Sequence, residues 1–91
     1  MRQIDHFIAG GAGAAPVRFG DVYDPNNGCI QARVALGDAA VLERAVQAAL
    51  AAQPAWAATN PQRRARVMFD FKRLIEDNMD DLAHMLSAEH G

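Results

Sequence analysis

Apolar and polar residues change their spacing once along this chain, close to Gly37. Before that point, the segment 29–36 alternates apolar and polar residues, which is the pattern of a half-buried strand. A proline and an Asn-Gly pair lie within 24–28, and both favour a tight turn. We therefore predict an antiparallel β-hairpin with strands at about 17–24 and 29–36, and a further strand at about 4–9 alongside it.

After Gly37 the apolar residues follow the period of a helix instead. Asp38 is a suitable N-cap for this helix. Pro54 lacks the amide hydrogen that a helix interior needs, so we predict that the helix spans about 38–53 and ends in a short turn. The residues that share one face of this helix are Val41, Leu42, Ala45, Val46, Ala49 and Leu50.

A second start signal follows, because Asn60 can cap a helix whose first position is Pro61. We predict this helix at about 61–77, and Asn78 is expected to end it and to cap a third helix at about 79–90. The expected buried stripe of the second helix consists of Val67, Met68, Phe71, Leu74 and Ile75, and the apolar face of the third consists of Met79, Leu82, Ala83 and Leu86.

The predicted fold class is therefore α+β, an N-terminal antiparallel β-hairpin followed by three α-helices, with no domain boundary within residues 1–91. No strand pattern follows the third helix to cover its far side, so we expect a truncated fold. The apolar faces of the first two helices should then be exposed, and the isolated chain should tend to associate.

Composition limits the classes of protein that remain. Hydrophobic residues make up 51% and charged residues 22% of the chain, which favours a soluble globular protein over a disordered or membrane protein. The net charge of −2 argues against nucleic acid and anionic membranes as partners. The one basic run, Arg63, Arg64 and Arg66, has no aromatic residues interleaved with it, so solvated or salt-bridged arginines are the better interpretation.

Targeting signals and cysteine use indicate a compartment. Residues 1–6 are too polar for a signal peptide, which needs roughly 7–15 unbroken apolar residues. Cys29 is the only cysteine and cannot form an internal disulfide, so we expect a cytoplasmic protein. No base or positive group lies near Cys29 in the sequence, so we interpret it as a small buried or half-buried filler rather than a nucleophile.

Other candidate sites are weak when taken alone. The run Gly11-Ala12-Gly13 resembles part of a dinucleotide loop, but a strand pattern rather than a helix follows it, so a mobile or tight loop is expected over 10–16. No metal-ligand spacing is present. His6, His84 and His90 are therefore interpreted as surface groups or as groups that only support a neighbouring side chain, and the acidic cluster Glu76, Asp77, Asp80 and Asp81 as a solvated junction with favourable charges at the start of the third helix.

Six runs together resemble the start of the aldehyde dehydrogenase superfamily in order and spacing. They are His6-Phe7-Ile8-Ala9-Gly10-Gly11, Val22-Tyr23-Asp24-Pro25-Asn26-Asn27-Gly28, Gly37-Asp38-Ala39-Ala40-Val41, Ala52-Gln53-Pro54-Ala55-Trp56, Thr59-Asn60-Pro61-Gln62-Arg63-Arg64-Ala65-Arg66-Val67 and Ala88-Glu89-His90-Gly91. The closing Glu-His-Gly resembles the CoA-acylating methylmalonate-semialdehyde dehydrogenases within that superfamily.

The resemblance implies that this chain is the N-terminal segment of a larger α/β enzyme. That parent would be a homo-oligomer that oxidises methylmalonate or malonate semialdehyde with NAD and transfers the acyl group to coenzyme A, as in valine catabolism. The family's cysteine nucleophile and nucleotide-binding strands lie downstream of the matched segment. We therefore expect no catalytic, cofactor-binding or metal-binding residues here, and a structural role beside the rest of the parent enzyme. Another aldehyde dehydrogenase subfamily, or a stand-alone helical binding module, are the alternatives.

The resemblance also points to one possible ion site. Some relatives hold a monovalent cation with backbone carbonyls before the turn proline and with a carboxylate near the end of this segment. Val22, Tyr23 and Glu89 occupy the comparable positions. Because relatives carry aspartate where this chain has Glu89, whether these residues form a cation site is left open by the sequence.

Overall fold

A small β-sheet followed by three helices forms the fold in the computed structural model, which describes residues 1–13 and 15–91. The predicted α+β arrangement, a β-hairpin and then three helices, is confirmed. The elements are β1 (Arg2–Ile4), β2 (Phe7–Ile8), β3 (Gly11–Ala12), β4 (Arg18–Tyr23), β5 (Ile30–Leu36), α1 (Ala39–Ala58), α2 (Pro61–Asp77) and α3 (Met79–His90).

The three-stranded sheet has the order β1-β5-β4, with β5 in the centre. β4 and β5 form the predicted antiparallel hairpin, and β1 pairs with β5 in parallel. The turn between β4 and β5 closes on Asp24, whose carbonyl accepts from the Gly28 N–H at 2.8 Å. Gly28 has a φ of 73°, a conformation that glycine adopts without steric cost. Ala32 and Ala35 of β5, with 1% and 7% of their surface exposed, are the buried hydrophobic residues of the described chain.

The single strand predicted at 4–9 is wrong. β1 ends at Ile4, and the chain then enters a separate antiparallel pair of β2 and β3. Ala9 and Gly10, with φ values of 54° and 81°, make the turn of this pair. Glycine adopts a positive φ readily, but alanine rarely does, so the sequence does not indicate that the turn begins at Ala9. The loop predicted over 10–16 therefore contains β3, and its residue Ala14 lies outside the described residues.

The predicted end of the first helix at residue 53 is also wrong, because α1 continues through Pro54 to Ala58. Proline there removes a single backbone hydrogen bond, and the alanines on both sides favour the helix strongly enough to continue it. α1 ends at Thr59, whose N–H and hydroxyl both donate to the Ala55 carbonyl, at 3.1 and 2.8 Å. At its start, the predicted N-cap is confirmed, since the Asp38 carboxylate accepts from the Val41 N–H at 2.9 Å.

The second and third helices have the predicted bounds. The Asn60 side chain accepts from the Arg63 N–H at 2.9 Å and caps α2 ahead of Pro61. Asn78 fulfils half of its predicted role. Its side-chain amide donates back to the Leu74 carbonyl at 2.8 Å and closes α2, but it makes no side-chain hydrogen bond to α3.

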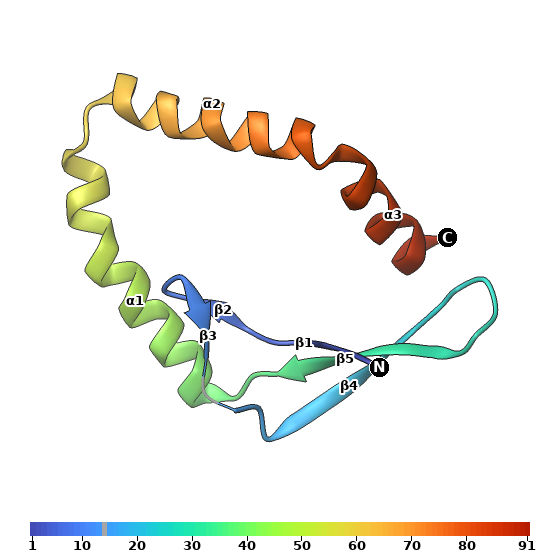
Figure 1. Ribbon diagram of the computed structural model, residues 1–91. Coiled ribbons are helices and arrows are strands. Elements are labelled where there is room, and N and C mark those ends of the chain that lie inside the picture. Colours follow the sequence, from blue (N-terminus) through green and yellow to red (C-terminus); the bar gives the residue numbers. More distant parts are fainter. Residues whose placement is uncertain (14) are drawn as a thin grey trace.

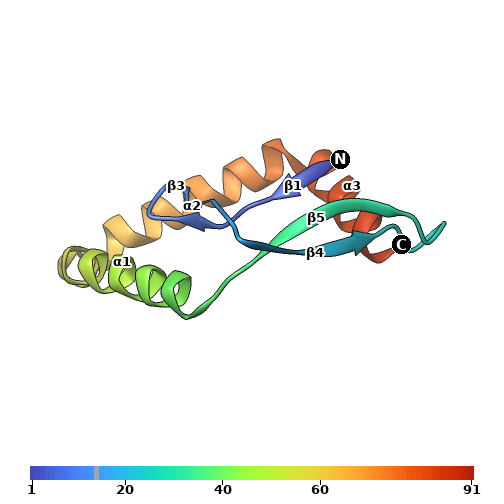
Figure 2. The ribbon, with the colours of Figure 1, turned by 90° about the horizontal axis from the view of Figure 1, so that it is seen from below.

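These elements form an open, flat ring. In Figure 1, α1 rises from the sheet, α2 crosses the top and α3 returns toward the β4–β5 turn. Figure 2 shows the same elements in a thin layer, consistent with extents of 48 × 34 × 15 Å. The radius of gyration is 16.9 Å, against about 12 Å for a compact domain of this length. No described helix is long and apolar enough to cross a membrane.

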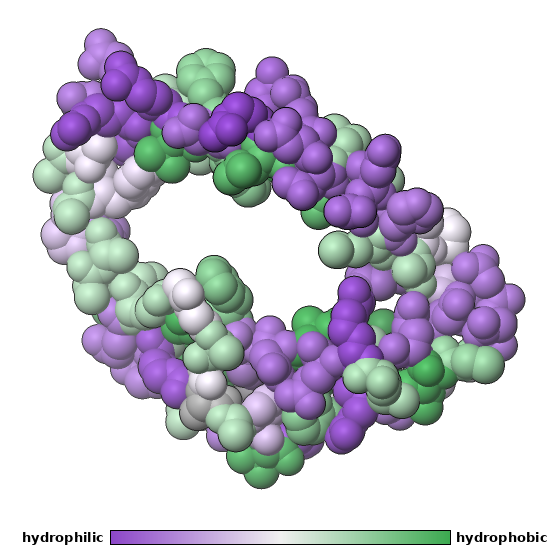
Figure 3. Space-filling model, viewed as in Figure 1, coloured by the Kyte–Doolittle hydropathy of each residue, from purple (hydrophilic) through white to green (hydrophobic). Residues whose placement is uncertain are grey.

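None of the three helices contains a buried residue. The buried stripe predicted on the second helix is therefore wrong for this chain, because no other element covers α2, and the predicted exposure of the apolar faces of α1 and α2 is confirmed. Figure 3 shows an opening through the molecule, with hydrophobic residues along the inner side of α2. Large apolar side chains with at least half of their surface exposed include Leu42, Leu50, Val67, Met68, Phe69, Phe71, Leu74, Met79, Met85 and Leu86.

Candidate functional site

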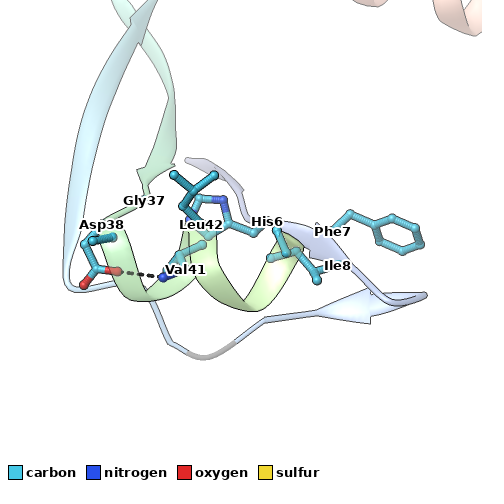
Figure 4. Close-up of a pocket in the computed structure, with 9 residues that line it drawn as sticks. His6, Phe7, Ile8, Gly37, Asp38, Val41 and Leu42 are labelled. Carbon is cyan, nitrogen blue, oxygen red and sulfur yellow. Dashed lines mark hydrogen bonds between the residues drawn. The ribbon is translucent and has the colours of Figure 1, made fainter. Parts of the chain in front are cut away.

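A recess of about 570 Å³ lies between β2 and the start of α1. Figure 4 shows the His6 ring beside Gly37 and Leu42, and the Phe7 ring directed away from the helix. A side chain at Gly37 would lie 3.6 Å from the His6 ring, so glycine allows the ring to approach the chain here. The recess is lined by His6, Phe7, Ile8, Gly37, Asp38, Ala39, Val41, Leu42 and Ala45.

Few side chains that could take part in a reaction line this recess. The Asp38 carboxylate is engaged as the N-cap of α1, and His6 Nε2 has no hydrogen-bond partner among the described residues. Most of the lining is apolar. Among the described residues that line the recess, the His6 imidazole has no nucleophile, no unengaged acid and no second metal ligand beside it.

Cys29 is exposed, so the prediction that it is buried or half-buried is wrong. It lies at the end of the β4–β5 turn, directly before β5 begins at Ile30, and its N–H donates to the Asn27 side chain at 2.8 Å. The Cys29 thiol contacts the Asn27 carbonyl at 4.0 Å. Neither the side-chain oxygen nor the backbone carbonyl of Asn27 is a base that could take the proton of a thiol. In the part of the chain that the structure describes, the Cys29 thiol therefore contacts no base that could activate it as a nucleophile.

The structure does not assemble a metal centre from the other candidates. Within the described residues, no three His, Cys, Asp or Glu side chains lie close enough to hold an ion. Asp80 and Asp81 lie in the first turn of α3, where negative charge favours the helix, and Glu76 pairs with Lys72 at 3.4 Å. These acidic groups therefore act as helix-end and surface charges.

The glycine run does not form a nucleotide loop. Gly11 belongs to β3 of the antiparallel pair, and no helix begins between it and β4 in the described residues. A pyrophosphate site needs the start of a helix next to its glycines. A side chain at Gly13 would lie 2.7 Å from the Arg44 guanidinium, so this glycine makes room for Arg44 instead.

The end of α3 meets the β4–β5 turn, which brings the residues compared with a cation site into one region. The Gln31 side-chain amide donates to the Tyr23 carbonyl at 3.2 Å and to the Ala88 carbonyl at 2.7 Å. Beside it, Arg2 of β1 forms an ion pair with Glu89 at 3.4 Å. Sequence reasoning missed both contacts, because Gln31 has only the signal of a polar residue in an alternating strand.

The sequence pattern of the aldehyde dehydrogenase family matches residues 14–91, which includes both strands of the hairpin and all three helices. The chain therefore belongs to the aldehyde dehydrogenase family, as the resemblance of its turn and helix-start motifs predicts.

Among the relatives of this chain are malonate-semialdehyde dehydrogenases. The one from Pseudomonas aeruginosa is 40% identical over 91 residues, covering 100% of this chain and 18% of its own length. The one from Bacillus pumilus is 43% identical over 70 residues, 77% of this chain and 14% of its own. A 2-aminomuconic semialdehyde dehydrogenase from Bos taurus is 33% identical over 91 residues, covering 100% of this chain and 18% of its own length.

Solved structures agree with this assignment. A Sinorhizobium meliloti structure assigned as a methylmalonate-semialdehyde dehydrogenase, complexed with NAD, is 51% identical with a TM-score of 0.95. A methylmalonate-semialdehyde dehydrogenase from Oceanimonas doudoroffii is 37% identical with a TM-score of 0.95. Both comparisons cover 100% of this chain and 19% of the other. The chain thus spans about a fifth of the length of these proteins.

Proposed function

We propose that this chain forms the N-terminal part of an NAD-dependent enzyme that oxidises malonate or methylmalonate semialdehyde to an acyl-CoA. The observation that carries the proposal is the match of the whole chain, at 51% identity and a TM-score of 0.95, to a methylmalonate-semialdehyde dehydrogenase complexed with NAD. The proposal includes coenzyme A as the acyl acceptor, a homo-oligomeric enzyme, a place in valine catabolism and a cytoplasmic location.

Within this proposal the chain has a structural role. NAD, when bound to the enzyme, would accept the hydride from the substrate. In this chain the glycines are used in a hairpin turn and in packing against Arg44, and Cys29 has no activating base, so neither supplies that chemistry. The ring of α1, α2 and α3 instead offers exposed apolar faces. We propose that these faces pack against the nucleotide-binding part of the enzyme and against a neighbouring subunit.

The test uses the protein at the full length that its coding frame encodes. NADH formation is followed with malonate semialdehyde and methylmalonate semialdehyde, with and without coenzyme A, and 2-aminomuconic semialdehyde serves as the comparison substrate. We expect turnover of the first two that requires coenzyme A and yields an acyl-CoA detectable by mass spectrometry. Preference for the comparison substrate, or a free acid as product, would assign the chain to another subfamily.

A stand-alone binding module is the second candidate, and the exposed apolar helices are the observation that favours it. The coding frame separates the two, because a stop codon directly after Gly91 supports the module and rules out the enzyme part. Calorimetric titration of the 91-residue chain with NAD adds a second criterion. We expect no heat of binding, and measurable affinity would contradict the structural role.

A further inference from the structure

One side chain connects the two ends of the ring. Gln31 lies on the central strand β5, and its amide nitrogen donates to two carbonyl oxygens of segments that are far apart in sequence. One belongs to Tyr23 at the end of β4, and the other to Ala88 in the last turn of α3. Both hydrogens of the amide are thereby used, at distances of 3.2 and 2.7 Å.

Two more contacts surround this amide. The Arg2 guanidinium lies 3.4 Å from the Glu89 carboxylate, one residue beyond Ala88. Gly91 lies against the turn, since a side chain there would be 3.6 Å from the Pro25 ring. The end of α3 therefore rests on β1, on β5 and on the β4–β5 turn, which agrees with its position in Figure 1.

These contacts do not fit a bound monovalent cation. A cation is coordinated by oxygen lone pairs, whereas the group that faces both carbonyls here is a hydrogen-bond donor. The carboxylate that would supply negative charge, Glu89, already has a positive partner in Arg2. The carbonyl of Tyr23 and the side chain of Glu89 are thus each engaged by a group of the protein itself.

We propose that the Gln31 amide, assisted by Arg2, takes the structural place that a monovalent cation has in some relatives. The joint between the hairpin and α3 is then held by protein groups alone, and neither Na⁺ nor K⁺ stabilises the folded protein specifically. Gln31 is a positioning residue, because it acts through the two backbone segments that it joins. The proposal concerns folding stability, so it does not depend on the substrate proposed above.

The reversed orientation of the Gln31 amide predicts a different dependence of thermal stability on the cation in solution. If the Gln31 amide were rotated by half a turn, its oxygen would face two carbonyl oxygens, and only a cation between them would make this favourable. Na⁺ or K⁺ would then raise the thermal midpoint more than a large organic cation does. The ion dependence of stability therefore decides between the two arrangements.

The experiment measures the thermal midpoint of the protein, at the length its coding frame encodes, in NaCl, KCl and choline chloride at equal ionic strength. For the unmodified protein we expect equal midpoints in all three salts. Gln31→Leu removes both donors and should lower the midpoint by about 2 °C or more in every salt. Gln31→Glu places a carboxylate oxygen at the joint and should be lower in choline chloride, with partial recovery in NaCl or KCl.

Gln47 provides the matched control, because it is an exposed glutamine on α1 that bonds only to Glu43, at 2.9 Å, among the described residues. Gln47→Leu and Gln47→Glu should leave the midpoint and its ion dependence unchanged. A midpoint of the unmodified protein that rises in NaCl or KCl relative to choline chloride overturns the proposal, as does a Gln31→Leu midpoint equal to that of the unmodified protein. If Gln31→Leu fails to fold, the ion dependence of the other proteins still decides.

Discussion

The sheet of β1, β5 and β4 and the arc formed by the helices α1, α2 and α3 are stabilised in different ways. In the sheet, β5 is paired on both sides, and its Ala32 and Ala35 are buried. In the arc, α1, α2 and α3 contain no buried residue, and their side-chain bonds within the helices link residues three or four positions apart. The sheet is stabilised by pairing between segments that are distant in sequence, whereas the arc is stabilised mainly by bonds within each helix, apart from the contacts of Gln31 with Ala88 and of Arg2 with Glu89 at the end of α3.

Because its apolar faces are not buried, the arc of α1, α2 and α3 lacks the main source of stability for helices in proteins. Helices of 12 to 20 residues are marginal in water on their own, because most of their stability comes from burying an apolar face. The caps at Asp38 and Asn60 define where helices begin, but they do not cover the faces. We therefore expect the apolar faces of the arc to pack against a partner surface.

The first prediction compares the chain of residues 1–91 alone with the protein at its full coding length. Without a partner surface, the 91-residue chain should bind a dye for exposed apolar surface and associate with rising concentration. Its helix signal should melt broadly, whereas the protein at its full coding length should melt cooperatively. Light scattering and circular dichroism measure this, and a monomeric chain with a sharp transition would show that the arc is stable alone.

The second prediction compares opposite faces of α2. Phe71 shares a face with Ile75, and Phe69 lies on the other side of the helix; both rings are more than half exposed, at 55% and 70%. Phe71→Glu in the full-length protein should cost about 3 kcal/mol or more, because the partner surface would meet a charge in place of a ring. Denaturation of the two variants measures this, and Phe69→Glu is the control with a small expected effect.

From the sequence, the starts and ends of the helices in the arc can be predicted better than the contacts of the arc with other segments. Both N-caps and the bounds of α2 and α3 follow from residue types within one turn of the helix ends. The Pro54 prediction is wrong because the alanines on both sides of Pro54 favour the helix strongly enough to continue it despite the one missing hydrogen bond. The Gln31 bridge joins residues 57 positions apart, and no local pattern encodes such a contact.

The third prediction concerns Pro54, which lies inside α1 without ending it. Pro54→Ala restores the backbone hydrogen bond and should stabilise the full-length protein by roughly 1–3 kcal/mol. Pro61→Ala is the matched control, because proline at the first position of α2 removes no helical bond and the change should be close to neutral. Chemical denaturation measures both, and a loss of stability in Pro54→Ala would mean that the proline shapes α1 for its partner.

The fourth prediction concerns the joint between the sheet and the arc. Asp38→Ala removes the cap at the start of α1 and should cost about 1 kcal/mol. Asp38→Asn keeps an acceptor oxygen and should recover most of the stability. The free energy of unfolding of the two variants provides the measurement. Equal losses in both would show that the charge of Asp38, rather than its hydrogen bond, stabilises α1.

The smallest effect is expected at the other joint, between Arg2 and Glu89. The two side chains are 51% and 49% exposed and 3.4 Å apart, and such pairs contribute about 0.2–1 kcal/mol. A double-mutant cycle of Arg2→Gln and Glu89→Gln measures the coupling, which should fall as salt rises. A larger coupling that resists salt would mean that a partner surface covers this ion pair as well. α3 would then be stabilised by a buried contact with the sheet, and only α1 and α2 would depend on local bonds.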